Sequence, residues 1–127
     1  MKYLGGKTRI AQEIVDAMRV DGPWWEPFCG GLSVSTRLAG TGPGLCSDAH
    51  PALIALYKAI AAGWDPPSAL SEVEYRAARE LPDSDPRKAF AGFGCAFSGK
   101  YFGGYARSRK ENFAATARRG LLRDVGA

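Results

Sequence analysis

The order of the expected elements predicts an α/β fold with a small parallel sheet. The first 62 residues alternate between helical and extended patterns, and a glycine turn and a helix separate the two extended segments. Such alternation is typical of parallel sheets, because a helix carries the chain back between neighbouring strands. Only two strands are recognisable, whereas a sheet usually has about five. We therefore expect an incomplete hydrophobic core.

The elements before residue 63 follow from apolar spacing and from residues that end helices. Apolar residues recur at helical spacing from Ile10 to Met18, which predicts a helix over residues 7–20 that ends at an Asp-Gly-Pro stop. The aromatic run Trp24–Phe28 is typical of a buried strand. The remaining elements expected here are a short helix over 32–38, a strand over 45–47 and a helix over 51–62 with Pro51 at its first position.

The elements after residue 62 are expected to be mostly helical. Ser71 and Glu74 form a capping-box pattern, which marks the start of a helix. Asp85 before Pro86 is typical of another helix start. The expected elements are a helix over 72–80, a helix from Pro86 with Phe90, Phe93 and Phe97 on one face, a loop or hairpin over 98–109, and a basic helix over 112–125.

Positive charge is concentrated in the last quarter of the chain. The net charge is +4, but residues 1–99 hold ten basic and eleven acidic side chains, whereas residues 100–127 hold seven basic and two acidic ones. A basic segment often marks a polyanionic partner. A solvated helix face with a tail explains the same charges, so composition leaves both interpretations open.

Several classes of protein are excluded by the sequence. No apolar run approaches the roughly 20 residues of a membrane helix, and the charged N-terminal segment is not a secretory signal. The three cysteines, Cys29, Cys46 and Cys95, include no Cys-x-x-Cys pair, so we expect free thiols and no metal. We expect a cytoplasmic protein without a membrane partner. His50, the only histidine, is expected to be a surface or capping residue.

A glycine turn and a spaced acid indicate a ligand site. The strand ending in Glu26-Pro27-Phe28-Cys29-Gly30-Gly31 leads into a helix, which lets the backbone and the helix N-terminus approach an anionic group. Asp48 follows Phe28 by 20 residues, where dinucleotide-binding folds place an acid that accepts hydrogen bonds from ribose. A plain turn with a capping aspartate remains the alternative. Gly5-Gly6-Lys7-Thr8 is not a P-loop, because Met1 stands where that motif needs glycine.

Three motifs follow one another along the chain. They are Lys2-Tyr3-Leu4-Gly5-Gly6-Lys7, then Glu26-Pro27-Phe28-x-Gly30-Gly31, then Ser47-Asp48-Ala49-His50-Pro51 with Leu53, Ile54 and Tyr57. In this order they resemble the start of DNA adenine-N6 methyltransferases of the D12 (Dam-like) class. A further segment, Phe93-Gly94-Cys95 through Gly103-Gly104-Tyr105-Ala106-Arg107, is similar to phage-encoded members and extends the resemblance over nearly the whole chain.

The resemblance implies a partial Rossmann-like fold of S-adenosylmethionine-dependent methyltransferases with a mostly helical DNA-recognition insertion. Residues 1–62 would be the cofactor-binding α/β part and residues 63–127 the helical, basic DNA-recognition part of one compact unit. The implied activity is site-specific DNA methylation, as in restriction-modification systems. The implied cofactor is S-adenosylmethionine, without a metal.

The resemblance also assigns residues to the cofactor. Tyr3 would pack on it, Lys7 would pair with its carboxylate and Asp48 would bind its ribose. The turn that contains Glu26, Phe28 and Gly30 would face the methionine end. Members of the family often have Gly-x-Gly in this turn, where this chain has Gly30-Gly31-Leu32.

Recognition of double-stranded DNA would belong to the segment after residue 99. Its cations can neutralise phosphates and its aromatic rings can stack on bases, with the target adenine flipped out of the duplex. A solvated loop with packed tyrosines is the alternative. The candidate residues are Lys100, Tyr101, Tyr105, Arg107, Arg109 and Lys110.

No catalytic residue is assigned. The catalytic motif of the family is Asp-Pro-Pro-Tyr, placed after the DNA-recognition region, whereas Asp65-Pro66-Pro67-Ser68 precedes that region and is interpreted as a structural turn. We therefore expect the chain to be inactive alone. Either a second chain supplies the catalytic half or the protein is a truncated remnant. We favour the truncated remnant, because nothing in the sequence shows a partner. A non-catalytic DNA-binding or regulatory module and an unrelated nucleotide-binding α/β protein are the alternative functions.

Overall fold

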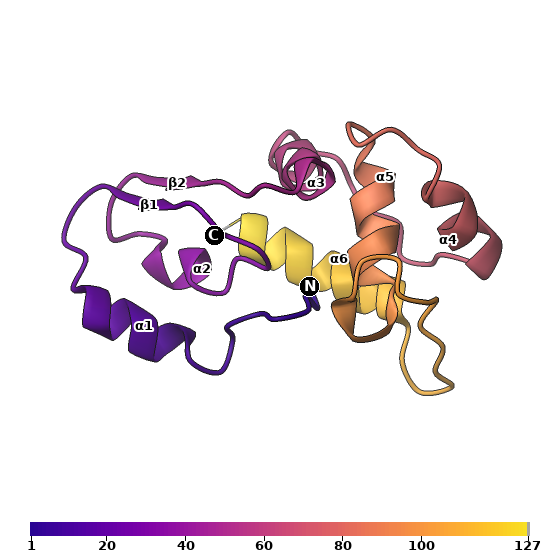
Figure 1. The fold of residues 1–127 in the computed structure, drawn as a ribbon, viewed down its shortest axis with the longest axis horizontal. Coiled ribbons are helices and arrows are strands. Elements are labelled where there is room, and N and C mark those ends of the chain that lie inside the picture. The colour runs from indigo at the N-terminus through magenta and orange to yellow at the C-terminus, as the bar shows by residue number, and fades with distance from the viewer. Residues whose placement is uncertain (127) are drawn as a thin grey trace.

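A computed structural model describes residues 1–126 and contains a small parallel sheet (Figure 1). Strand β1 (Trp24–Glu26) pairs in parallel with β2 (Gly44–Cys46), and Trp25 lies opposite Leu45. No third strand is present among the described residues. The expected mixture of helices with a small parallel sheet is therefore confirmed.

The other regular elements of the described chain are helices. The side chains of His50, Ser71, Asp85 and Asn112 each accept a backbone hydrogen bond at a helix N-terminus, and Ser71 and Asp85 are the caps that the sequence predicts. The capping role expected of His50 is thus confirmed. The helices are α1 (Ala11–Met18), α2 (Ser35–Leu38), α3 (Pro51–Ala61), α4 (Glu72–Ala78), α5 (Pro86–Ala89), the π-helical η1 (Phe90–Gly94), the 3₁₀ turn η2 (Phe97–Gly99) and α6 (Phe113–Val125).

Three expectations about helices were wrong in part. Helix α1 starts at Ala11 and not at residue 7, because residues 8–10 form a turn. Helix α2 starts three residues late because Leu32 has a left-handed φ of 64°. Phe97 does not share the buried face of Phe90 and is 70% exposed, because the helix ends at Gly94 and the chain turns back.

The main hydrophobic core lies between α3, the α5–η1 helix and α6. Leu53 and Leu56 from α3, Phe90 from η1 and Leu121 from α6 are fully buried there. In Figure 1, α6 lies against α3 and against the helix that runs from α5 into η1, with its contacts on η1, so residues from both parts of the chain share this core. All three cysteines are free, as expected.

The sheet is covered on one side. A second, smaller core of Ala11, Val34 and Leu38 joins α1 and α2 beneath it, with the Trp24 ring packed against them. Figure 1 shows α1 and α2 on that side of the strands and no element across the other. The side chains of Trp25 and Leu45, which point to the open side, are each 61% exposed. None of the described helices is long and apolar enough to cross a bilayer.

Candidate functional site

The six residues assigned to the cofactor lie together around one crevice. It has a volume of about 210 Å³ and lies where β1 and β2 end. Gly5, Gly6, Cys29, Gly31, Ser33 and Val34 complete the wall. The residues that the sequence brings into this crevice are Tyr3, Lys7, Glu26, Phe28, Gly30 and Asp48.

Asp48 is held by the backbone at the end of β2. One carboxylate oxygen accepts a hydrogen bond from the Gly30 N–H at 2.9 Å, and the other accepts one from the His50 N–H at 3.0 Å. A carboxylate can accept about four hydrogen bonds in all. Each oxygen therefore keeps a lone pair for a ligand hydroxyl, and the two backbone hydrogen bonds fix the orientation of the carboxylate.

The glycine turn makes room for the Tyr3 ring. A Cβ atom on Gly30 would lie 3.0 Å from Tyr3 Cε1, and one on Gly31 would lie 2.9 Å from Tyr3 Cβ. Gly30 also has a positive φ of 43°, and its carbonyl accepts a hydrogen bond from the Tyr57 hydroxyl at 2.6 Å. Glycine at both positions therefore allows the ring to lie directly against the turn.

Burial sets the protonation of groups around the crevice. It raises the pKa of the Tyr3 hydroxyl, and the negative charge of Asp48, followed by that of Cys29 once this thiol ionises at high pH, adds to the effect. Burial, followed by the charges of Cys46, Asp48 and Glu26, raises the pKa of the Cys29 thiol to about 12. Both groups are therefore neutral at physiological pH, and Cys29 is not a nucleophile there.

The rim of the crevice combines an exposed ring with charged groups. Phe28 is 81% exposed although it follows a strand, so its ring is available to a ligand. Lys7 is exposed and has no carboxylate within ion-pair distance among residues 1–126. The half-buried carboxylate of Glu26 accepts a hydrogen bond from the Ser35 hydroxyl, which fixes its position.

The six residues assigned to DNA fall into two groups of three. Tyr101 has a buried hydroxyl and packs against Phe93, and the Tyr105 hydroxyl donates to the Leu70 carbonyl at 2.5 Å. Arg107 is paired with the carboxylate of Glu72. The other three, Lys100, Arg109 and Lys110, are exposed and form no ion pair within the described chain.

The Asp65-Pro66-Pro67-Ser68 segment is bonded to the last helix. The Arg118 guanidinium donates to the Asp65 carboxylate at 2.8 Å and to the Pro66 carbonyl at 3.0 Å. The Asn112 amide donates to the Ser68 carbonyl at 3.0 Å. These contacts attach the segment to α6 and leave it outside the crevice, as a structural turn would be.

Sequence reasoning missed Ser33, which lines the crevice, and the hydroxyl residues Thr8 and Ser35, which contact crevice residues. The Ser33 hydroxyl lies 3.1 Å from that of Thr8, and Ser35 holds Glu26. Ser33 and Ser35 at the start of α2 were the available signal, because hydroxyl side chains favour helix N-termini. No group of three or more His, Cys, Asp or Glu side chains within residues 1–126 is placed to hold a metal ion.

Comparison with known proteins supports the resemblance stated above. A family model for D12 class N6 adenine-specific DNA methyltransferases matches residues 3–117. Neither the curated proteins nor the solved structures give a match to the chain. Because the family match extends over most of the 127 residues and includes the crevice, the chain belongs to the D12 class of N6 adenine-specific DNA methyltransferases.

Proposed function

We propose that this chain is the S-adenosylmethionine-binding portion of a site-specific DNA adenine-N6 methyltransferase with a Rossmann-like fold. The observation that carries the proposal is the convergence of Tyr3, Lys7 and Asp48 on one crevice at the ends of two parallel strands. Ligands of open parallel sheets bind at this edge. The family membership supplies the reaction class, which is methyl transfer to DNA.

The donor set of the crevice fits the cofactor. S-adenosylmethionine has a ribose with hydroxyl donors, an amino-acid carboxylate and an adenine ring. Asp48 offers free lone pairs to the hydroxyls, Lys7 offers a positive charge to the carboxylate, and Phe28 offers an exposed aromatic face. The crevice is smaller than the roughly 300 Å³ at which ligand pockets usually begin, so one end of the cofactor would occupy it.

When bound, the cofactor supplies a methyl group on a positively charged sulfur. The residues of this chain would hold and orient it. Tyr3 lies against the Gly30-Gly31 turn and forms one wall, while Glu26, which also lines the crevice, would face the methionine part. Tyr57 keeps the turn in place through the Gly30 carbonyl.

We propose that residues 1–62 form the cofactor-binding part and residues 63–127 the DNA-recognition part. The second part has no β-strand among its described residues and carries the exposed cations Lys100, Arg109 and Lys110. The internal contacts of Tyr101, Tyr105 and Arg107 favour a supporting role for these three. The residues that would contact the phosphates of double-stranded DNA directly are Lys100, Arg109 and Lys110.

We further propose that these 127 residues do not transfer methyl groups alone. The Asp-Pro-Pro segment that they contain is engaged by Arg118 and lies outside the crevice. The missing group would have to hold the adenine amine beside the cofactor. A catalytic group supplied from outside these 127 residues and a non-catalytic remnant of the family are both compatible with this arrangement.

Calorimetric titration with S-adenosylmethionine tests the cofactor site. Removing a charged hydrogen-bond acceptor costs about 2 kcal/mol, so Asp48→Ala should weaken binding by more than tenfold. Asp21→Ala is the matched control, because Asp21 is exposed and does not line the crevice. Equal affinity of the Asp48 and Asp21 variants would remove Asp48 from the site.

A methyl-transfer assay on adenine-containing DNA separates the possible roles. The purified 127-residue chain should give no turnover above background. Turnover that Lys7→Ala abolishes would contradict the proposed inactivity. If a candidate completing chain restores activity, the protein is half of an enzyme, and binding of cofactor and DNA without turnover favours the non-catalytic remnant.

A further inference from the structure

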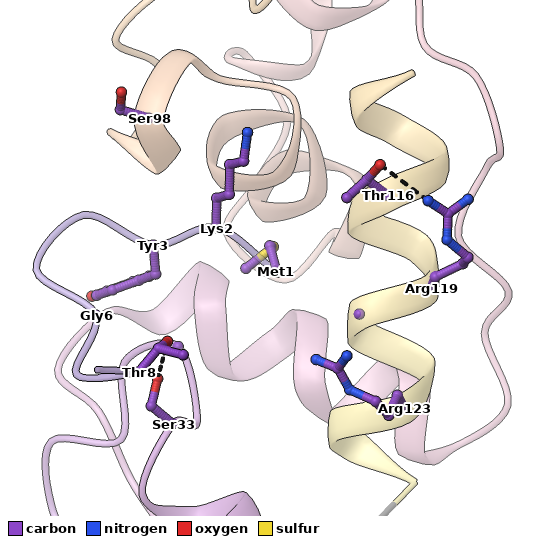
Figure 2. A pocket seen from close by; sticks show the side chains of 12 residues that line it. Met1, Lys2, Tyr3, Gly6, Thr8, Ser33, Ser98, Thr116, Arg119 and Arg123 are labelled. Carbon is purple, nitrogen blue, oxygen red and sulfur yellow. Dashed lines mark hydrogen bonds between the residues drawn. The ribbon is translucent and has the colours of Figure 1, made fainter. Parts of the chain in front are cut away.

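A basic groove lies next to the cofactor crevice, between the N-terminal motif and the basic last helix. The groove has a volume of about 490 Å³ and lies between the N-terminal segment and α6 (Figure 2). Lys2 lines one side, and Arg119 and Arg123 from α6 line the other. None of the residues that line it is an aspartate or a glutamate.

The charge of this groove is only partly neutralised. Lys2 lies 3.7 Å from Glu111, and Arg123 donates to Asp124 at 2.8 Å. Arg119 has no carboxylate within ion-pair distance in the described chain, and its guanidinium donates only to the Thr116 hydroxyl at 3.3 Å. The three side chains are exposed, so each can turn toward an incoming anion.

Hydroxyl groups accompany these cations. Figure 2 shows the Arg123 guanidinium pointing toward the Thr8–Ser33 pair across the groove, and Arg119 folded back along α6 toward Thr116. Exposed cations with neighbouring hydroxyl donors are the set that binds phosphate oxygens in protein–DNA complexes.

The groove and the crevice have a common wall. Tyr3, Gly6, Gly31 and Ser33 line both of them. A phosphate in the groove would therefore lie one side chain away from a ligand in the crevice. Because the acceptor in this family is a base attached to a phosphate backbone, this adjacency matches the geometry of the substrate.

We propose that this groove binds backbone phosphates of the DNA strand that carries the acceptor adenine, with Arg119 and Arg123 as the main phosphate-binding residues. The proposal rests on the proposed function for the neighbouring cofactor site. It assigns phosphate contacts beside the crevice to α6, in addition to the exposed cations of residues 100–110. Arg119 and Arg123 are positioning residues, because phosphate contacts fix the strand and do not select its sequence.

The test is the salt dependence of binding to a fluorescently labelled, adenine-containing DNA duplex. The slope of log affinity against log salt is negative, and each lost phosphate contact reduces its magnitude by about 0.9. Arg119→Gln with Arg123→Gln should therefore reduce the magnitude of the slope by about 1.8 and weaken binding about tenfold or more at low salt. Arg119→Lys with Arg123→Lys keeps the charge and should stay close to the unaltered protein.

The matched control is Arg19→Gln with Lys58→Gln, which removes the same charge from exposed residues outside both the groove and the proposed DNA-recognition part. Far-UV circular dichroism should show that each variant folds. Equal slopes for the groove and control variants would overturn the proposal, as would a lack of duplex binding by the unaltered chain at low salt.

Two further measurements separate the alternatives. Binding of dAMP as tight as that of the duplex, and lost in the Arg119/Arg123 variant, would indicate a mononucleotide site and overturn the assignment to DNA. Calorimetry with S-adenosylmethionine should give the same affinity for the Arg119/Arg123 variant as for the unaltered chain. If neither the unaltered chain nor the Arg119/Arg123 variant binds S-adenosylmethionine, but the magnitude of the salt slope of DNA binding is still lower in the variant, the proposed cofactor function is wrong and the proposed phosphate-binding groove is supported.

Discussion

At the residue scale, the shape of the crevice depends on the absence of a side chain at Gly31. A Cβ atom there would lie 2.9 Å from Tyr3 Cβ, and neither atom can rotate away. Gly31→Ala should therefore displace Tyr3 and weaken S-adenosylmethionine binding by about tenfold, since overpacking typically costs about 1–3 kcal/mol. Gly22→Ala is the control, because no atom lies within 4 Å of its added Cβ. Equal calorimetric affinities for the two variants would contradict this packing argument.

The buried thiols give a second prediction at this scale. Burial raises the pKa of both Cys29 and Cys95 to about 12, so at pH 8 only on the order of one thiol in ten thousand is ionised at each site. Neither cysteine should react with iodoacetamide in the folded protein at this pH, whereas all three should react in guanidinium. Rapid labelling of Cys29 in the native state, read by mass spectrometry, would show that the crevice is more open than described.

The same two thiols make stability depend on alkaline pH. A free cysteine has a pKa of about 8.5 when unfolded, so the folded state binds these protons more tightly. Their contribution is complete below about pH 8.5 and is lost as the pH rises toward 12. The melting temperature should fall over this range, and less steeply in Cys29→Ala with Cys95→Ala. Parallel curves for the two proteins would exclude the thiols as the cause.

The glycine turn and the acid after it could be predicted from local sequence, whereas Tyr3 and Lys7 were assigned only through the family resemblance, and the cofactor roles of all these residues stay predictions. The glycine turn and Asp48, 20 residues after Phe28, are visible in the sequence. The partners of Tyr101 and Tyr105 were not visible, because their contacts come from residues distant in the chain, such as Leu70. Arg119 and Arg123 belong to the basic segment of residues 100–127, for which the sequence left a polyanionic partner and a solvated helix face both open.

At the element scale, α6 begins at a residue with two functions. The Asn112 side chain accepts a hydrogen bond from the Ala115 N–H and donates one to the Ser68 carbonyl, both at 3.0 Å. Asn112→Ala should lower the free energy of unfolding by about 1–2 kcal/mol in urea denaturation. Asn112→Asp keeps the cap and loses only the bond to the Ser68 carbonyl. Its free energy of unfolding should therefore lie between those of the unaltered protein and of Asn112→Ala. An aspartate variant as unstable as the alanine variant would mean that the cap contributes little.

Helix boundaries were predicted well where a side chain caps the first turn. Ser71 and Asp85 mark their helices correctly, because the signal is local. The end of the α5–η1 helix was missed. Phe97 has the helical spacing of Phe90, but an Ala96–Tyr105 bridge redirects the chain before it. Pairing over a long sequence separation overrides local periodicity there.

At the scale of the whole molecule, the open side of the sheet is an apolar surface. Trp25 and Leu45 lie opposite one another on it, each 61% exposed, and strand edges beside such a surface favour association. Trp25→Thr with Leu45→Thr should reduce concentration-dependent sedimentation. Val73→Thr, which alters a comparably exposed apolar residue on α4, should leave association unchanged. Association that persists in the Trp25/Leu45 variant would locate the contact elsewhere.

The wall that the groove and the crevice share has a thermodynamic consequence. A ligand in the groove and a ligand in the crevice would both contact Tyr3, because this residue lines both sites. Its ring packs closely against Gly30 and Gly31. A shift of this ring on binding one ligand changes the surface offered to the other, and free-energy coupling between two sites is reciprocal. Cofactor and DNA would therefore alter each other's affinity by the same factor. Tyr3 would transmit that coupling, because it is part of both binding sites.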